Sequence, residues 1–304
     1  MQLLKNLALA KTNIIFIINP ISGGKDKTKI PEVIDRYLDK AKFNANFRFT
    51  EYPGHAAEIA AEAGLKNFEV VIAVGGDGTI NEVSTQVLKQ GKILGILPFG
   101  SGNGLSRYLK IPMNTIKALE VINGMHVKRI DTANFNGMPY FNMAGMGFDA
   151  HISALFAANK KRGLSGYVKT GLKELLNYKA QHYKIRVDGR VLERDAFVVS
   201  IANSSQYGNN TYISPEASIT DGLLDVCIIK AFPLIKLPKL AYQMIRGNTH
   251  KSSMVEIIRG RKVEISRSTE AAIHIDGEPH MMGKEIDIYI VPRSLNIITP
   301  DYEA

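Results

Sequence analysis

VVIAVGGDGTINEV, residues 70–83, is the stretch from which the fold of this chain can be worked out. It opens with the apolar, β-branched run Val70–Val74, which is typical of a strand buried on both faces. Glycines interrupt the run at Gly75–Thr79, and a helical pattern resumes from Ile80. Glycines between a strand and a helix let the backbone approach a phosphate, to which the helix start offers unpaired N–H groups. The stretch therefore predicts a phosphate-binding turn, with a plain turn as the alternative.

Asp77 is an acid in the middle of this predicted phosphate site. A carboxylate does not attract phosphate, so Asp77 needs another role. It can hold a magnesium ion, bind a ribose or polarise a hydroxyl group. The residue type alone leaves these three roles open.

Composition restricts the class of protein. The 304 residues indicate about two domains, and 45% hydrophobic content suits a globular core. The single cysteine, Cys227, excludes an internal disulfide framework and fits a reducing compartment. No apolar stretch approaches the ~20 residues that span a bilayer, and the start of the chain is too interrupted for a signal peptide. We therefore expect a cytoplasmic protein.

The net charge of +9 suits a partner of negative charge, such as nucleic acid, anionic lipid or a nucleotide. The sequence has no zinc-ligand spacing, RNA-binding aromatic signature or helix-turn-helix, so nucleic acid is not favoured. Much of the positive charge falls in one segment with few acids, which is either a solvated face or a surface for anionic membrane. Its cations are Lys160, Lys161, Arg162, Lys169, Lys173, Lys179, Lys184, Arg186, Arg190 and Arg194.

Two further glycine-containing loops follow predicted strands in the first half. The strand Asn13–Ile18 runs into the loop Asn19–Lys25. The strand Ile93–Leu97 runs into a loop that contains Gly100–Gly104. In an open parallel sheet the carboxyl ends of the strands share one edge, so these loops and Gly75–Thr79 are expected to converge. The first half therefore reads as an α/β nucleotide-binding domain.

The alternation of strands and helices stops near Lys128. Beyond it the pattern is rich in strands, with a hairpin predicted to turn at Asp188-Gly189 and helices at Leu164–Tyr178 and Leu234–Arg246. This half reads as an antiparallel sandwich or barrel. We expect domains at 11–128 and 129–304, with the alternative that the last segment returns to the first domain.

Acids beside glycines mark candidate sites in the second half. Asp221 with Asp225 forms either an oxygen cage for a divalent metal ion or a hairpin turn. Asp276 and Glu278 would leave a strand on the same face, where one can act as a general base, and a turn is again the alternative. Asp149 is a weaker candidate.

Motifs of glycine, asparagine and acids follow one another along nearly the whole chain past residue 11. They are Asn19-Pro20 with Ser22-Gly23, Thr50 with Gly54-His55-Ala56, Gly75–Thr79 with Asn81-Glu82, Pro98 with Gly100–Asn103, Phe141-Asn142, Gly147–Ala150, Asp221-Gly222 with Leu224-Asp225, and Asp276–Glu278. This ordered set resembles the diacylglycerol kinase catalytic-domain family, which includes bacterial soluble lipid kinases, sphingosine kinases and ceramide kinases. GGDGT alone is shared with NAD kinases and phosphofructokinases, so the ordered set carries the resemblance.

The resemblance implies an N-terminal α/β nucleotide-binding domain of the phosphofructokinase and NAD kinase type, followed by an all-β C-terminal sandwich that carries the lipid. It implies ATP and Mg²⁺ as cofactors. The catalytic residues would be Asp77, Glu278 and Asp276, and the metal ligands Asp221, Asp225 and Asp77. The nucleotide would be held by Asn19, Ser22, Gly23, Thr50, Gly75, Gly76, Gly78, Thr79, Glu82, Gly100, Ser101, Gly102 and Asn103.

The resemblance further implies transfer of the ATP γ-phosphoryl group to a primary hydroxyl of a diacylglycerol-type or sphingoid-type lipid, in phospholipid biosynthesis. The protein would meet this lipid peripherally at an anionic membrane surface. Whether it forms a homodimer is left open. Bacterial diacylglycerol kinases of this group often have an Asp where this chain has Gly104, and GSGNG is closer to the sphingosine and ceramide kinases. The alternatives are an NAD-kinase-like kinase of a soluble substrate and a non-catalytic lipid-binding or regulatory protein.

Overall fold

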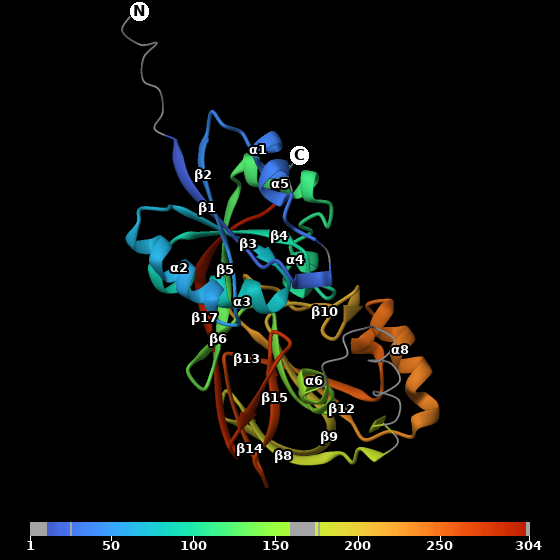
Figure 1. The fold of residues 1–304 in the computed structure, drawn as a ribbon. Coiled ribbons are helices and arrows are strands. Elements are labelled where there is room, and N and C mark those ends of the chain that lie inside the picture. The colour runs from blue at the N-terminus through green and yellow to red at the C-terminus, as the bar shows by residue number, and fades with distance from the viewer. Residues whose placement is uncertain (1–10, 25, 159–173, 176, 302–304) are drawn as a thin grey trace, which may run out of the picture. The chain divides into compact units, whose positions relative to one another are not determined.

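The computed structural model describes residues 11–24, 26–158, 174–175 and 177–301 and divides them into two compact units (Figure 1). Unit 1 contains the residues up to Arg129 and those from Leu295 onward, and unit 2 contains Ile130–Ser294. No helix in this described part is long and apolar enough to cross a membrane. The start of the chain, most of the predicted helix Leu164–Tyr178 and five predicted surface cations lie outside the described residues, the cations being Lys160, Lys161, Arg162, Lys169 and Lys173.

Unit 1 is a parallel sheet with helices. Its elements are β1 (Thr12–Ile18), η1 (Ser22–Gly24), α1 (Ile30–Tyr37), β2 (Phe43–Phe49), α2 (His55–Leu65), β3 (Val70–Gly75), α3 (Asp77–Gln90), β4 (Ile93–Pro98), α4 (Gly104–Tyr108), α5 (Thr115–Gly124), the start of β5 (Val127–Phe135) and the end of β17 (Glu285–Ile298). The strand order is β17-β4-β3-β1-β2. Strand β3 lies between β1 and β4, and every residue from Val70 to Val74 is apolar and fully buried, as expected for a central parallel strand that is covered on both faces of the sheet. The predicted α/β class is confirmed.

Helix α3 begins at Asp77 rather than at Ile80, so the last three residues of Gly75–Thr79 form its first turn. Gly76 is the N-cap residue and has an extended backbone. Asp77 therefore lies at the positive end of the helix dipole, where an acid is favoured. The low helix propensity of glycine hid this first turn from a reading of the sequence.

Unit 2 is dominated by antiparallel strands. Its elements are β6 (Met138–Tyr140), β7 (Met143–Gly147), α6 (Phe148–Ala158), β8 (Gln181–Val187), β9 (Arg190–Ala202), β10 (Gln206–Gly208), β11 (Thr211–Tyr212), β12 (Leu224–Lys230), η2 (Leu234–Lys236), α8 (Leu237–Ile245), η3 (Thr249–Lys251), β13 (Val255–Gly260), β14 (Lys262–Arg267), β15 (Ala271–Ile275), β16 (Glu278–Met282) and most of β17. The predicted hairpin is confirmed, because β8 and β9 are joined by Asp188 and Gly189 with φ of 46° and 87°.

The strands of unit 2 follow the order β16-β15-β7-β9-β8-β14-β17, and β12 pairs with β9 on one side and with β13 on the other. Their inward-facing side chains form one large apolar core, which includes Tyr183, Val199 and Ile288. A smaller core contains Leu240 of α8 together with Cys227 of β12. Cys227 is fully buried, and burial raises the pKa of its thiol, as expected for an inert core cysteine. The all-β sandwich class is confirmed, with α6 and α8 added to the strands.

Candidate active site

Three loops at the carboxyl edge of the unit 1 sheet touch one another through glycines. An ideal Cβ on Gly23, after β1, would lie 1.9 Å from the carbonyl oxygen of Phe99, after β4. An ideal Cβ on Gly100 would lie 2.6 Å from the Cα of Gly76, after β3. No side chain fits at either position, because the neighbouring atoms belong to the backbone. The predicted convergence of the three loops is therefore confirmed.

The carboxylate of Asp77 joins α3 to the third loop. Its Oδ2 atom accepts a hydrogen bond of 2.9 Å from the N–H of Asn103, and its Oδ1 atom accepts one of 2.9 Å from the N–H of Gly104. An ideal Cβ on Gly102 would lie 2.9 Å from the same Oδ2 atom, so glycine is also needed there. A carboxylate offers about four lone pairs, so these two bonds orient the group without exhausting its capacity to bind a cation.

Two asparagines fix the backbone around this carboxylate. Asn103 has a left-handed φ of 51°, which asparagine tolerates better than most residues. Its side chain accepts from the N–H of Gly100 at 2.9 Å and donates to the carbonyl of the same residue at 2.7 Å. Asn19 donates to the hydroxyl of Thr79 at 2.9 Å, which links the first loop to the first turn of α3. Both asparagines thus hold the loops in place through side-chain hydrogen bonds.

The other predicted nucleotide residues lie near these loops or brace them. Glu82 accepts the N–H of Gly54 at 3.1 Å, which ties α3 to the start of α2. Thr50 is buried, and its N–H donates to the end of β1 at 2.9 Å. Ser22 donates to a carbonyl of its own loop at 3.2 Å, and Ser101 is exposed. Glu82 and Thr50 therefore support the site, while Ser101 is open to solvent.

Lys27 follows the first loop in the sequence, and its side chain packs against that loop. A charged side chain gave no reason to expect this burial. Its side chain is almost fully buried at 1% exposure. Its ammonium group donates to the carbonyl of Ser22 and to that of Pro20 at 3.4 Å. The same group lies 5.3 Å from the centre of the Phe99 ring, in the third loop. Lys27 thus connects the first and third loops.

Asp276 and Glu278 do not leave one strand, contrary to the expectation from their spacing. β15 ends at Ile275 and β16 begins at Glu278, so Asp276 and Gly277 form a two-residue turn with φ of 48° and 89°. Positive φ at both central residues is the geometry that an Asp-Gly hairpin turn favours. The turn alternative is correct.

The two acids at this turn have different surroundings. Asp276 is buried, and its carboxylate accepts backbone N–H groups of Phe141 at 3.0 Å, Asn142 at 2.8 Å and Met143 at 3.1 Å. Glu278 is exposed. Asp276 therefore secures the segment before β7, while Glu278 can reach a solvent-borne partner.

The candidate metal ligands of unit 2 have protein partners. Asp221 accepts the N–H of Leu223 at 3.0 Å. Asp225 is buried, accepts the Ser214 hydroxyl, and pairs with Arg259 at 3.0 Å. Burial raises the pKa of Asp225, and these two partners oppose the rise. In the part of the chain that the structure describes, no three His, Cys, Asp or Glu side chains are grouped so as to hold a metal ion.

Asp149 lies in a polar cluster inside unit 2. Its Oδ2 atom contacts the ring of His274 at 3.1 Å and accepts the hydroxyl of Tyr207 at 2.9 Å. Ser200 hydrogen bonds with the same tyrosine hydroxyl, and burial raises the pKa of Tyr207. The cluster joins the first turn of α6 to β9, β10 and β15. His274, Tyr207 and Ser200 have no motif of their own, so the sequence did not indicate them.

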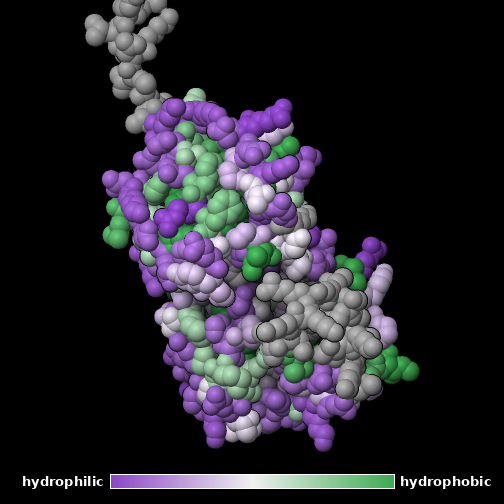
Figure 2. All heavy atoms as spheres, in the orientation of Figure 1, coloured by the Kyte–Doolittle hydropathy of each residue, from purple (hydrophilic) through white to green (hydrophobic). Residues whose placement is uncertain are grey.

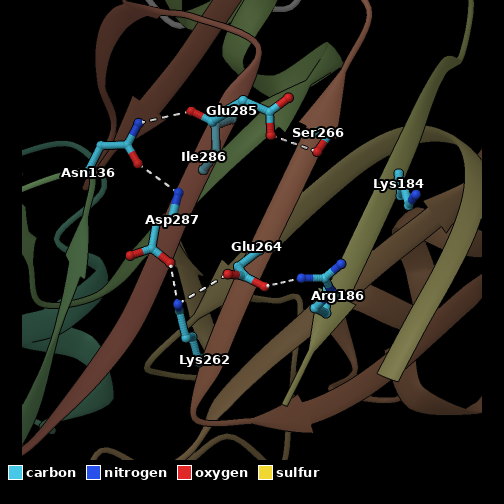
Figure 3. A pocket seen from close by; sticks show the side chains of 9 residues that line it. All are labelled: Asn136, Lys184, Arg186, Lys262, Glu264, Ser266, Glu285, Ile286 and Asp287. Atoms are coloured by element: carbon cyan, nitrogen blue, oxygen red, sulfur yellow. Dashed lines mark hydrogen bonds and ion pairs between the residues drawn. The ribbon is translucent and has the colours of Figure 1, made fainter. Parts of the chain in front are cut away.

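A pocket of about 390 Å³ lies on the outer face of β8, β14 and β17 (Figure 3). Four of its charged side chains form ion pairs with one another. Lys262 lies 3.1 Å from Glu264 and 3.3 Å from Asp287, and Glu264 also pairs with Arg186 at 3.1 Å. Because these four charges are already paired and the lining holds three cations and three acids, the pocket is a poor candidate for binding a charged substrate.

Comparison with known proteins covers both units. Residues 13–135 match the family described as diacylglycerol kinase catalytic domain, and residues 142–299 match the YegS C-terminal NAD kinase beta sandwich-like domain. A diacylglycerol kinase of Bacillus subtilis (strain 168) is 28% identical over 297 residues, which cover 95% of this chain and 96% of that protein. A diacylglycerol kinase of Staphylococcus saprophyticus is 29% identical over 267 residues, covering 86% of this chain and 87% of that protein.

The fold is also similar to that of a solved structure. The crystal structure of a Bacillus anthracis str. Sterne protein, assigned provisionally as a diacylglycerol kinase, has a TM-score of 0.78 to this chain. The two chains are 25% identical, and the match covers 95% of this chain and 97% of that one.

Proposed function

Since this chain belongs to the diacylglycerol kinase catalytic-domain family and is a lipid kinase, we propose that it transfers the γ-phosphoryl group of ATP to the primary hydroxyl of diacylglycerol. The observation that carries the proposal is the position of Asp77, whose carboxylate is fixed by Asn103 and Gly104 where three glycine loops converge. Phosphoryl transfer requires little covalent help from a protein and much positioning of phosphates. Converging backbone loops at a helix start suit that requirement.

The nucleotide is proposed to bind at this edge of unit 1. The N–H groups at the start of α3 and those of Ser101 and Gly102 in the third loop would hold its phosphates. Asn19 and Lys27 would keep the loops together. Magnesium, when bound, neutralises the charge on the β- and γ-phosphate oxygens. Asp77 fits such an ion, because Mg²⁺ is usually held by one or two carboxylates together with phosphates. Asp221 and Asp225 have no part in this proposal, since Asp225 is already paired with Arg259.

Gly104 does not count against diacylglycerol as the acceptor. The contact of Gly104 with Asp77 is made by its backbone N–H, which an Asp at that position would also supply. The replacement of Asp by Gly therefore leaves this contact with Asp77 available. The names of the relatives from Bacillus subtilis and Staphylococcus saprophyticus support the same acceptor.

The proposal is tested with purified protein, Mg-ATP labelled in the γ-phosphate, and mixed micelles that contain one acceptor at a time. We expect label in the organic phase with diacylglycerol, and much less with sphingosine or ceramide. NAD in solution should yield no labelled product. Label in NAD alone would support the soluble-substrate alternative, and no label with any acceptor would support a non-catalytic protein.

Glu278 is proposed as the base that receives the acceptor proton, with Asp276 as the residue that holds its turn. Glu278→Gln should lower kcat about 10²-fold, because the amide cannot take a proton, while the free energy of unfolding changes by less than about 0.5 kcal/mol. Asp276→Asn, which changes the net charge equally, should lower the free energy of unfolding by about 2 kcal/mol, because a buried N–H loses its acceptor. Chemical denaturation and steady-state kinetics measure both. A Glu278→Gln protein with unchanged kcat would remove Glu278 from the mechanism.

We propose that the protein is located in the cytoplasm and associates peripherally with anionic membranes. The acceptor is a membrane lipid, and no spanning helix occurs in the described residues. Nucleic acid has no part in this proposal, and a homodimer stays a prediction.

A further inference from the structure

Helix α8 carries apolar side chains on two opposite faces. On one face Leu240 is buried at 3% exposure and packs into the smaller core of unit 2, together with the partly buried Met244. On the other face Tyr242 is 61% exposed and Ile245 is 62% exposed. Ile235, in the turn η2 that leads into α8, is 87% exposed. A helix that has already buried one apolar face has no need of a second for folding.

These exposed side chains stand at helical spacing. Tyr242 and Ile245 are three residues apart, and Pro238 lies four residues before Tyr242 and is also exposed. Ile235 precedes Pro238 by three residues. Figure 2 shows apolar atoms standing out at the edge where Figure 1 places α8. The four residues, here called the α8 stripe, are Ile235, Pro238, Tyr242 and Ile245.

The charge around the α8 stripe has one sign. From residue 226 to residue 255 the sequence contains no Asp or Glu. The same span contains five cations, which are Lys230, Lys236, Lys239, Arg246 and Lys251. Lys230 pairs with Glu256, whereas Lys236 and Lys239, next to the stripe, have no anionic partner among the described residues. Arg246 lies 5.9 Å from the centre of the Tyr242 ring.

We propose that the α8 stripe and its flanking cations form the surface by which this protein docks on an anionic lipid bilayer. Apolar side chains with a tyrosine among them enter the boundary between headgroups and acyl chains, while lysines beside them are attracted to anionic headgroups. A protein partner would have to present acids to these lysines, which lie at the rim of the α8 stripe, and also an apolar surface to the stripe itself. The bilayer satisfies both the apolar and the cationic part at once.

This inference rests on the proposed function, because an acceptor that lies in a bilayer must be reached there. The docking surface would set the time that the enzyme spends at the membrane. It would have no part in the phosphoryl-transfer step, since none of its residues belongs to the nucleotide loops. Binding to vesicles and catalysis can therefore be measured separately.

The test compares Ile235→Glu with Leu65→Glu. Leu65, in α2 of unit 1, is also 87% exposed, so the two variants change the same kind of surface and the same net charge. Binding is measured without ATP, by sedimentation with vesicles of phosphatidylcholine alone or mixed equally with phosphatidylglycerol. We expect wild type and Leu65→Glu to bind the mixed vesicles within about twofold of each other. Ile235→Glu should bind them about tenfold more weakly, and all three should bind phosphatidylcholine poorly.

Three outcomes have distinct meanings. Equal binding by Ile235→Glu and Leu65→Glu would overturn the docking surface. A second outcome is a wild-type dimer in sedimentation velocity that Ile235→Glu dissociates, with vesicle binding unchanged. That outcome would show that the stripe binds a second copy of this chain and not a bilayer. Loss of vesicle binding in Ile235→Glu would support the surface even if no lipid were phosphorylated, so failure of the proposed function would be seen separately.

Discussion

Asp77→Asn is expected to lower kcat for lipid phosphorylation about 10³-fold while the protein stays folded. The Asp77 carboxylate accepts one N–H at each oxygen, from Asn103 and from Gly104. An asparagine has one acceptor oxygen and one NH₂ group, so one of these N–H groups would face another donor. The substitution also removes the negative charge proposed to hold the magnesium ion of the nucleotide. Kinetics with Mg-ATP and diacylglycerol micelles measure the loss, and thermal unfolding checks the fold.

Asp26→Asn is the matched control, because it removes the same charge from an acid in the first loop region. Asp26 is exposed and accepts the N–H of Thr28 at 2.9 Å, a bond that an asparagine oxygen can keep. We expect its kcat to stay within about twofold of wild type. If both variants lost activity equally, general electrostatics of the loops would explain the effect. If Asp77→Asn kept full activity, the proposed role of Asp77 would be wrong.

Gly23→Ala is expected to raise the KM for ATP at least about tenfold. The new Cβ would lie 1.9 Å from the carbonyl oxygen of Phe99, and a backbone atom cannot move away as a flexible side chain can. The first and third loops would therefore be forced apart. Lys27, which spans them, would lose its position over the Phe99 ring. Nucleotide titration and the KM for ATP report the change.

Gly24→Ala separates this collision from backbone strain. Gly23 and Gly24 have φ of 62° and 64°, so alanine is strained by about 1 kcal/mol at either position. An ideal Cβ on Gly24 meets nothing within 4 Å. Gly24→Ala should therefore lose some stability and keep its KM for ATP within about threefold of wild type. Equal KM values for the two variants would show that loop contact at Gly23 does not matter for nucleotide binding.

The sequence predicts those parts of the fold that depend on neighbouring residues. Val70–Val74 are apolar because both faces of this central strand are buried, and the run itself reveals this. Asp188-Gly189 specifies its own turn, since both residues tolerate positive φ. The convergence of the three loops follows from the parallel sheet. The sequence places the start of α3 three residues too late, because Asp77 to Thr79 are poor helix formers that the N-cap and helix dipole nevertheless accommodate.

Contacts between distant residues explain what the sequence did not reveal. The bond between Asp149 and His274 joins residues 125 positions apart, and no local pattern encodes it. Lys27 looks like a surface cation in a charged stretch, and only the carbonyl groups around it explain its burial. Asp276 and Glu278 suit a strand by their spacing, but three N–H groups from the segment 141–143 select the turn.

The end of β17 pairs with β4, where Asn296 lies beside Ile93 in a parallel register. Two strands that lie two-thirds of the chain apart in the sequence therefore pair in the same sheet. During synthesis the ribosome releases the whole of unit 2 before it releases this strand. Until then β4 has an open edge with unpaired N–H and carbonyl groups, which can pair with another nascent chain. The sheet of unit 1 is therefore completed only late in synthesis, by a strand that pairs at long sequence separation.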